Sequence, residues 1–137
     1  MVDKRAIVAQ AFDEWAAGTG YVSSLFADDM TWEIVGHSEA SRKYTDAEDF
    51  VSAVLTPFGQ RFTTTTPFRP VNIWQIVAEG DRVVVLWDGE GETIAGTTYR
   101  NTYAWFMTLD DDGKIVDGTA FYDSISFNEL WDTVAPQ

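Results

Sequence analysis

The chain has 137 residues, 45% of them hydrophobic and 15% aromatic, which predicts one folded domain, residues 1–137, and excludes a disordered chain. Its 22 acidic and 9 basic side chains give a formal net charge of -13, which argues against nucleic acid or an anionic membrane surface as a partner and favours neutral or cationic ligands. Cysteine is absent and His37 is the single histidine, so we expect no disulfide, no metal site and no cofactor.

The first half of the chain reads as helices around one strand. Apolar residues spaced three and four apart predict a helix over residues 3–17, which the glycines after it end. A helical turn is expected at 21–26, a strand at 30–35 and a loop at 37–44. A capping box at 45–48 starts a second helix that ends near 57–59. The N-terminal stretch carries mixed charge and no apolar run reaches membrane-spanning length, so we expect a cytoplasmic protein.

The second half reads as strands. Alternating apolar residues predict strands at 71–78, 82–87, 97–109 and 114–122, with hinges at 79–81, 88–92 and 110–113. Asp123 is then expected to cap a short last helix. Helices followed by antiparallel strands give an α+β domain, in which a curved sheet wraps over the helices as a cone with an apolar interior. The outer sheet face would pair two copies as a homodimer.

The long strand at 97–109 is the most informative element. Tyr99, Asn101, Tyr103 and Trp105 alternate onto one face, and flat apolar rings with polar tips are typical of a pocket that orients a small organic ligand. The alternative is an ordinary buried face whose polar tips are paired internally. The walls of the cone would come from the larger aromatic set Phe12, Trp15, Trp32, Phe50, Phe58, Trp74 and Trp105.

Several segments carry a resemblance to a known family. They are LFADDMTWEIVG at 25–36, AEGDRVVVLWDGEG at 78–91, and YRNTYAWF with the later DGKI and FYDS. The chain resembles the nuclear transport factor 2-like superfamily, within it the SnoaL-like group, with ketosteroid isomerase, limonene epoxide hydrolase and polyketide cyclase relatives. The resemblance implies the cone fold with an internal cavity, and it leaves the reaction open because this scaffold carries many chemistries.

The catalytic residues of these relatives do not carry over intact. The isomerase base position corresponds to Ile34, beside Glu33, and the isomerase hydrogen-bond donor falls near Trp105 or Tyr103. The epoxide hydrolase set corresponds to Arg82, Val84 and Ala120, with Trp32 and Ile34 at its Tyr and Asn positions. Both specific activities are therefore disfavoured. The residues expected to line the substrate site are Trp15, Trp32, Ile34, Val84, Trp105, Ala120 and Tyr122.

The remaining groups that could do chemistry are few. His37 follows a strand end and is the natural acid or base, unless it is a solvated loop histidine. Asn101 and Tyr103 would serve as donors to an oxyanion or a positioned water. Glu33 points away from the interior unless a bulge turns it inward.

These features favour a cofactor-independent enzyme acting on a neutral, hydrophobic, polyketide- or terpenoid-like molecule by acid–base chemistry. The alternative is a dimeric binding protein without catalysis. A weaker alternative is a protein-interaction role on the outer sheet face, for which the negative charge suits a basic partner.

Overall fold

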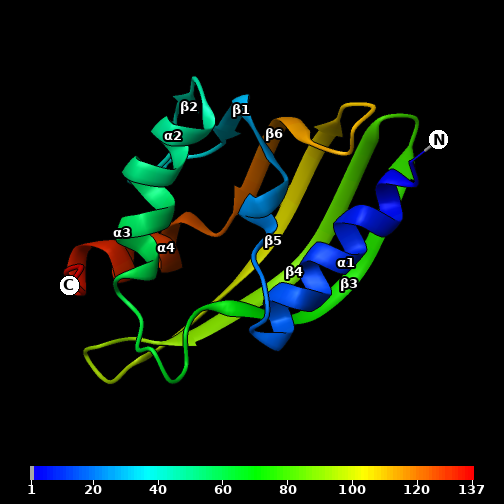
Figure 1. The fold of residues 1–137 in the computed structure, drawn as a ribbon. Coiled ribbons are helices and arrows are strands. Elements are labelled where there is room, and N and C mark those ends of the chain that lie inside the picture. The colour runs from blue at the N-terminus through cyan, green and yellow to red at the C-terminus, as the bar shows by residue number, and fades with distance from the viewer. Residues whose placement is uncertain (1) are drawn as a thin grey trace.

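The computed structural model describes residues 2–137 as four α-helices, one 3₁₀-helix, one π-helix and six strands that form one sheet (Figure 1). In chain order the elements are α1 (Lys4–Ala17), η1 (Val22–Leu25), β1 (Phe26–Ile34), β2 (Lys43–Tyr44), α2 (Ala47–Phe50), η2 (Val51–Leu55), α3 (Thr56–Gly59), β3 (Arg69–Glu79), β4 (Arg82–Glu92), β5 (Thr98–Leu109), β6 (Ile115–Tyr122) and α4 (Ser124–Thr133).

The curved sheet has the strand order β2-β1-β6-β5-β4-β3. Neighbouring strands are antiparallel except β1 and β6, which run parallel. The expected α+β cone is confirmed, and its sheet is mixed rather than purely antiparallel. The parallel pair arises because the chain reaches β6 only after the β3–β5 meander, and β6 then enters the sheet beside β1 in the same direction. No helix within residues 2–137 is both long and apolar enough to cross a membrane.

The first helix forms as the sequence predicts. The Asp3 carboxylate accepts a hydrogen bond from the amide of Ala6 at the start of α1, and Gly18 ends the helix with a left-handed φ of 77°. Val8, Ala11 and Phe12 make up its buried stripe. Figure 1 shows α1 lying along β3 and β4, whereas α2, α3 and α4 lie toward the other end of the sheet.

The second helical region runs from α2 through η2 to α3. The sequence places the N-cap of this region at Thr45, but the N-cap residue is Asp46. Asp46 adopts the extended conformation directly before the first turn, and its carboxylate accepts a hydrogen bond from the amide of Asp49. The middle stretch, η2, is a π-helix in which the amide of Thr56 donates to the carbonyl of Val51. Pro57 follows at once and has no N–H to donate, so a regular ladder cannot continue through it.

The strand β4 is longer than the sequence indicates. The expected hinge at 88–92 is wrong, because these residues continue β4 and pair with β5 up to Glu92. Glycine explains the difference. A Cβ at Gly89 would lie 2.2 Å from the Phe68 ring, and one at Gly91 would lie 2.8 Å from the Phe68 backbone. The two glycines therefore serve as close-approach positions within a strand and not as turn residues.

The outer face of the sheet is organised around Asp88. Its carboxylate accepts hydrogen bonds from Thr102, Trp74 and Asn72 and pairs with Arg100 at 3.2 Å. Burial by itself raises the pKa of Asp88, but these hydrogen bonds and the Arg100 charge lower it overall. Trp74 was expected in the cavity wall, and it lies instead on this outer face with 57% of its surface exposed.

A buried arginine joins the ends of two helices. The guanidinium of Arg61 donates to the carbonyls of Pro57 in α3, at 2.8 Å, and Trp131 in α4, at 3.2 Å. It also stacks over the Trp131 ring at 3.8 Å. Burial lowers the pKa of Arg61. A cation beside these late carbonyls complements the negative ends of both helices.

Candidate functional site

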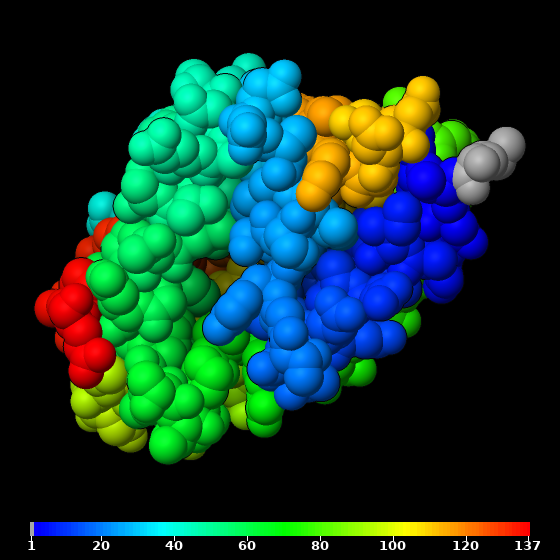
Figure 2. All heavy atoms as spheres, viewed as in Figure 1, coloured from blue at the N-terminus to red at the C-terminus, as the bar shows by residue number. Residues whose placement is uncertain are grey.

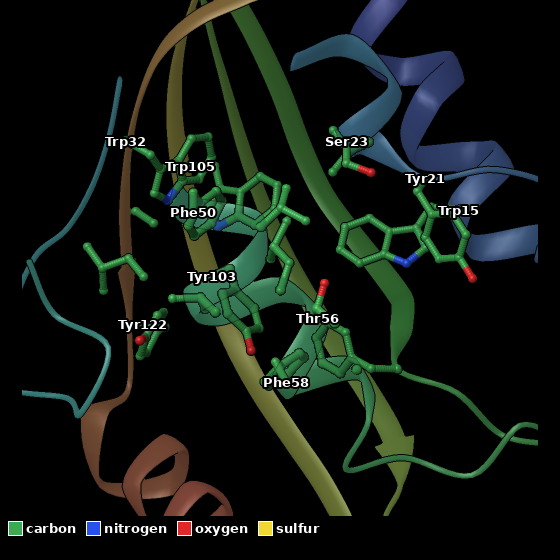
Figure 3. A pocket seen from close by; sticks show the side chains of 18 of the residues that line it. Trp15, Tyr21, Ser23, Trp32, Phe50, Thr56, Phe58, Tyr103, Trp105 and Tyr122 are labelled. Atoms are coloured by element: carbon green, nitrogen blue, oxygen red, sulfur yellow. The ribbon is translucent and has the colours of Figure 1, made fainter. Parts of the chain in front are cut away.

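The inner face of the sheet and the helices that cover it enclose a cavity of about 340 Å³. Figure 2 shows a small opening in the surface between the blue segment after α1 and the green helix α3. The wall is formed by Trp15, Tyr21, Val22, Ser23, Trp32, Ile34, Phe50, Val51, Val54, Leu55, Thr56, Phe58, Gly59, Pro67, Phe68, Trp87, Tyr103, Trp105, Ala120, Tyr122 and Phe127 (Figure 3).

Aromatic rings from α1 and three strands dominate the wall. Trp87 on β4 stacks on Tyr103 of β5 with 4.4 Å between ring centroids, and it meets Trp105 edge to face at 5.1 Å. Trp15 from α1 packs on Trp87 at 5.2 Å, and Trp32 from β1 lies 5.0 Å from Trp105. Each ring is held by others, so the wall is preorganised rather than shaped by flexible side chains.

One buried network of polar groups reaches the wall. The Asn101 amide Nδ2 donates to the Tyr99 hydroxyl at 2.8 Å, and that hydroxyl lies 2.9 Å from the hydroxyl of Tyr103. The same Nδ2 donates to the carbonyl of Asp123 at 3.0 Å, while Asn101 Oδ1 accepts the Asp123 amide. Asn101 therefore fastens β5 to the start of α4, and only Tyr103 of the three lines the cavity.

The tyrosines of the site are neutral donors near pH 7. Burial raises the pKa of Tyr99 to about 12 and the pKa of Tyr103 well above its ordinary value. Burial also raises the pKa of Tyr122, whose hydroxyl lies 2.7 Å from the hydroxyl of Ser38. A tyrosinate base in this wall is thus strongly disfavoured.

The wall contains no Asp, Glu, His, Lys or Arg side chain. Within residues 2–137 there is also no group of three or more His, Asp or Glu side chains placed to hold a metal ion. The polar atoms of the wall are hydroxyl and indole groups. Two of the indole nitrogens, Trp32 Nε1 and Trp87 Nε1, are buried and have no hydrogen-bond partner among the described residues.

The structure brings most of the expected site residues together. Tyr103 lines the cavity, and so do six of the expected substrate-binding positions, namely Trp15, Trp32, Ile34, Trp105, Ala120 and Tyr122.

Three expected residues lie elsewhere. His37 is exposed in the loop after β1 and does not line the cavity, because β1 ends before it and the chain turns outward. Val84 lies on the outer sheet face, since Val83 and Val85 take the inward positions of β4. Asn101 is 5% exposed and is satisfied inside the fold by Tyr99 and Asp123.

The sequence predicted Phe50 and Phe58 of the helical wall, but neither Val54 nor Trp87 was expected to line the site. The cavity-facing stripe of α2, η2 and α3 includes Phe50, Val54 and Phe58, which share the spacing of an ordinary buried helix face. Trp87 could have been found from the alternation Val83, Val85, Trp87, which places it on the inner face of the sheet.

Comparison with known proteins gives consistent results. A family model described as a SnoaL-like domain matches residues 7–118. No curated protein matches the chain.

Three of the similar solved structures share 17–20% identity with this chain. A protein with a cystatin-like fold from Xanthomonas campestris has 20% identity, a TM-score of 0.73 and coverage of 95% of this chain and 98% of its own. A candidate SnoaL-like polyketide cyclase from Jannaschia sp. CCS1 has 18% identity, a TM-score of 0.67 and coverage of 91% and 92%. A protein with a ketosteroid isomerase-like fold from Catenulispora acidiphila, in complex with trimethylamine, has 17% identity, a TM-score of 0.62 and coverage of 88% of both chains.

These likenesses establish the fold but no activity, because related scaffolds carry different chemistries. The match of the family model over most of the length, together with the cone and its internal cavity, shows that the chain belongs to the SnoaL-like domain family.

Proposed function

We propose that this protein binds a small, neutral, hydrophobic molecule in the cavity. The observation that carries the proposal is a cavity of about 340 Å³ whose wall is aromatic and contains no charged side chain. Taking the share of one liquid water as about 30 Å³, this volume equals roughly eleven waters, which is room for a molecule of two fused rings. A charged ligand would lose its hydration on entering the cavity and would find no opposite charge in the wall, so its binding would carry a large desolvation free energy.

The geometry supports binding better than acid–base catalysis. A general base must lie within about 3 Å of the proton that it removes, directly or through one water. The wall holds no carboxylate or imidazole, and the pKa values of Tyr103 and Tyr122 are raised away from the range of a base.

Catalysis is the second candidate function. The SnoaL-like and related folds include cofactor-free isomerases and cyclases, and the Tyr103 hydroxyl is placed where it could stabilise a developing oxyanion. Mass spectrometry of a ligand recovered after incubation with the protein distinguishes the two functions, since a converted ligand supports the enzyme and an unchanged ligand supports the binding protein.

A change at Ala120 tests the location of binding. Ala120 faces the cavity from β6, and Ala104 on β5 faces the outer side of the sheet, so the same substitution can be made on both faces. The neutral dye N-phenyl-1-naphthylamine is expected to gain fluorescence with the wild-type protein and with Ala104→Phe. Ala120→Phe fills part of the cavity, and we expect it to weaken dye binding at least tenfold. Equal binding by both variants, with native circular dichroism, would place the dye elsewhere and count against the proposal.

We also propose that two copies pair through the outer sheet face. Trp74, Val77 and Phe121 share this face and are 57%, 44% and 44% exposed. Trp74 is held in place by its hydrogen bond to Asp88, so little side-chain entropy remains to be lost when a partner covers it. Aromatic residues fixed on an exposed surface are typical of interface centres.

A further inference from the structure

We propose that the ligand is an amphiphile with one neutral polar group, which enters the cavity with its apolar end first and keeps the polar group at the mouth. This inference rests on the binding function proposed above, and it adds the chemical class of the ligand and its orientation. The distribution of exposed and buried residues along the wall carries it.

The mouth is defined by the wall residues that reach solvent. Five of the residues that line the cavity are exposed, namely Tyr21, Ser23, Thr56, Gly59 and Pro67. They come from the segment that follows α1, from α3 and from the loop before β3, and the first two of these segments border the opening seen in Figure 2. Three of the five carry a hydroxyl. A polar group of a ligand placed at the mouth therefore keeps its contact with water and with protein hydroxyls.

The opposite end of the cavity is closed by aromatic rings. Phe50 stacks on Trp32 with 4.9 Å between ring centroids, and Trp105 meets Trp32 edge to face at 5.0 Å. All three side chains are buried. Figure 3 shows them together on one side of the cavity, whereas Tyr21 and Ser23 lie on the other side. The closed end is thus suited to the apolar part of a ligand.

A polar group carried to the closed end would lose its water. The hydroxyls on the more buried part of the wall belong to Tyr103 and Tyr122, and they already lie 2.9 Å from the Tyr99 hydroxyl and 2.7 Å from the Ser38 hydroxyl. Burying a ligand hydroxyl without a new partner weakens binding by about 5- to 150-fold, whereas a hydroxyl at the mouth stays hydrated. An amphiphile therefore binds more tightly with its polar group directed outward.

The first test needs no variant and compares two ether alcohols of one skeleton. One is 2-(2-naphthyloxy)ethanol, which has one polar end, and the other is 2,6-bis(2-hydroxyethoxy)naphthalene, which has two. Each is titrated against bound N-phenyl-1-naphthylamine. The compound with one polar end is expected to displace the dye, and the compound with two must bury a hydroxyl and should bind about 5- to 150-fold more weakly. Equal affinities would overturn the inference, because both ends of the bound molecule would then remain in water.

The second test places a negative charge at the mouth. Thr56→Asp puts a carboxylate there, and the matched control Thr98→Asp puts one on an exposed strand residue that does not line the cavity. The two probes share one skeleton: 2-naphthalenemethanol is neutral, and 2-naphthylmethylamine is an ammonium ion at neutral pH. The quantity measured is the dissociation constant of the alcohol divided by that of the ammonium ion, which cancels changes in general hydrophobic affinity.

The ratio reports the position of the polar group. We expect it to rise about 1.4- to 5-fold in Thr56→Asp, as for an exposed ion pair, and to return toward the wild-type value in about 0.5 M salt. In Thr98→Asp it should stay at the wild-type value. A purely structural effect of the substitution at Thr56 would change the affinity for both probes and leave their ratio unchanged.

The outcomes separate this inference from the function on which it rests. A ratio that is unchanged in Thr56→Asp, or raised equally in both variants, places the polar group away from the mouth and overturns the inference while leaving cavity binding intact. Displacement of the dye by naphthalene but not by 2-(2-naphthyloxy)ethanol also overturns it. Failure of the dye itself to bind overturns the proposed function and the inference with it.

Discussion

Gly118 on β6 lies under the indole of Trp32, and replacing it with alanine should disturb both stability and the cavity wall. An added Cβ would lie 2.2 Å from Cε3 and Cζ3 of Trp32. An ordinary carbon–carbon contact is about 3.5 Å, so the ring would have to move by about 1.3 Å. Phe50 stacks on the same indole at 4.9 Å and Trp105 meets its edge at 5.0 Å, which leaves the ring little freedom to move.

The magnitude follows from two opposing effects. Overpacking a filled core costs about 1–3 kcal/mol, and alanine in place of glycine restores about 0.4–1 kcal/mol through the entropy of the unfolded chain. We therefore expect Gly118→Ala to lose about 1–2 kcal/mol of unfolding free energy. For a domain of this length that corresponds to a fall in melting temperature of about 3–6 °C.

Thermal unfolding followed by circular dichroism, together with dye titration, measures both effects. The matched control for the thermal unfolding is Gly59→Ala at the end of α3, where an added Cβ meets nothing within 4 Å; because Gly59 lines the cavity, dye affinity is compared with the wild-type protein instead. We expect the control to unfold at or slightly above the wild-type temperature. A Gly118→Ala protein as stable as the control, with unchanged dye affinity, would refute the packing argument.

Three further predictions concern the framework around the cavity. Arg61→Met removes two charge-assisted hydrogen bonds and a stacking contact, and it also relieves the desolvation of a buried guanidinium. We expect urea unfolding to show a net loss of about 2–4 kcal/mol of unfolding free energy. The control Arg69→Met, at an exposed strand position, should change the unfolding free energy little. Asp88 has a lowered pKa in the folded state, so its carboxylate stabilises the fold above the unfolded aspartate value of about 3.9 and loses that contribution as the pH falls through the folded pKa. Asp88→Asn should therefore unfold more easily at pH 7 but lose less stability on acidification, and identical pH profiles for the two proteins would contradict this. Sedimentation equilibrium should find a wild-type dimer and a folded Val77→Asp monomer, and a wild-type monomer at all concentrations would exclude pairing through the outer face.

Local patterns in the sequence were sufficient for most of the fold. The stripe of α1 and its glycine stop appear where the spacing of Val8 and Phe12 places them, and Asp123 caps α4 through the amide of Ile125 as predicted. The parallel pairing of β1 with β6 depends on contacts between distant parts of the chain. It could not be read from local periodicity, which carries no information on strand order.

The site was predictable where it depends on strand alternation and not where it depends on pairing or chain direction. Alternation correctly turned Tyr103 and Trp105 inward. It could not show that the polar tip of Asn101 is used by the backbone of Asp123, since that contact joins residues 22 positions apart. Reading the strand 82–87 by its own alternation, rather than by correspondence with a relative, would have put Val84 outside and Trp87 inside.

Four of the six tryptophans of the chain, Trp15, Trp32, Trp87 and Trp105, lie in one wall with neighbouring ring centroids 5.0–6.1 Å apart and planes inclined by 30–87°. Chromophores this close and this inclined share their excited states, so their electronic transitions couple as excitons. The folded protein should consequently carry a strong, structured near-ultraviolet dichroism signal that a guest molecule between the rings reshapes. The native chain thus contains its own optical reporter of occupancy, without any attached label.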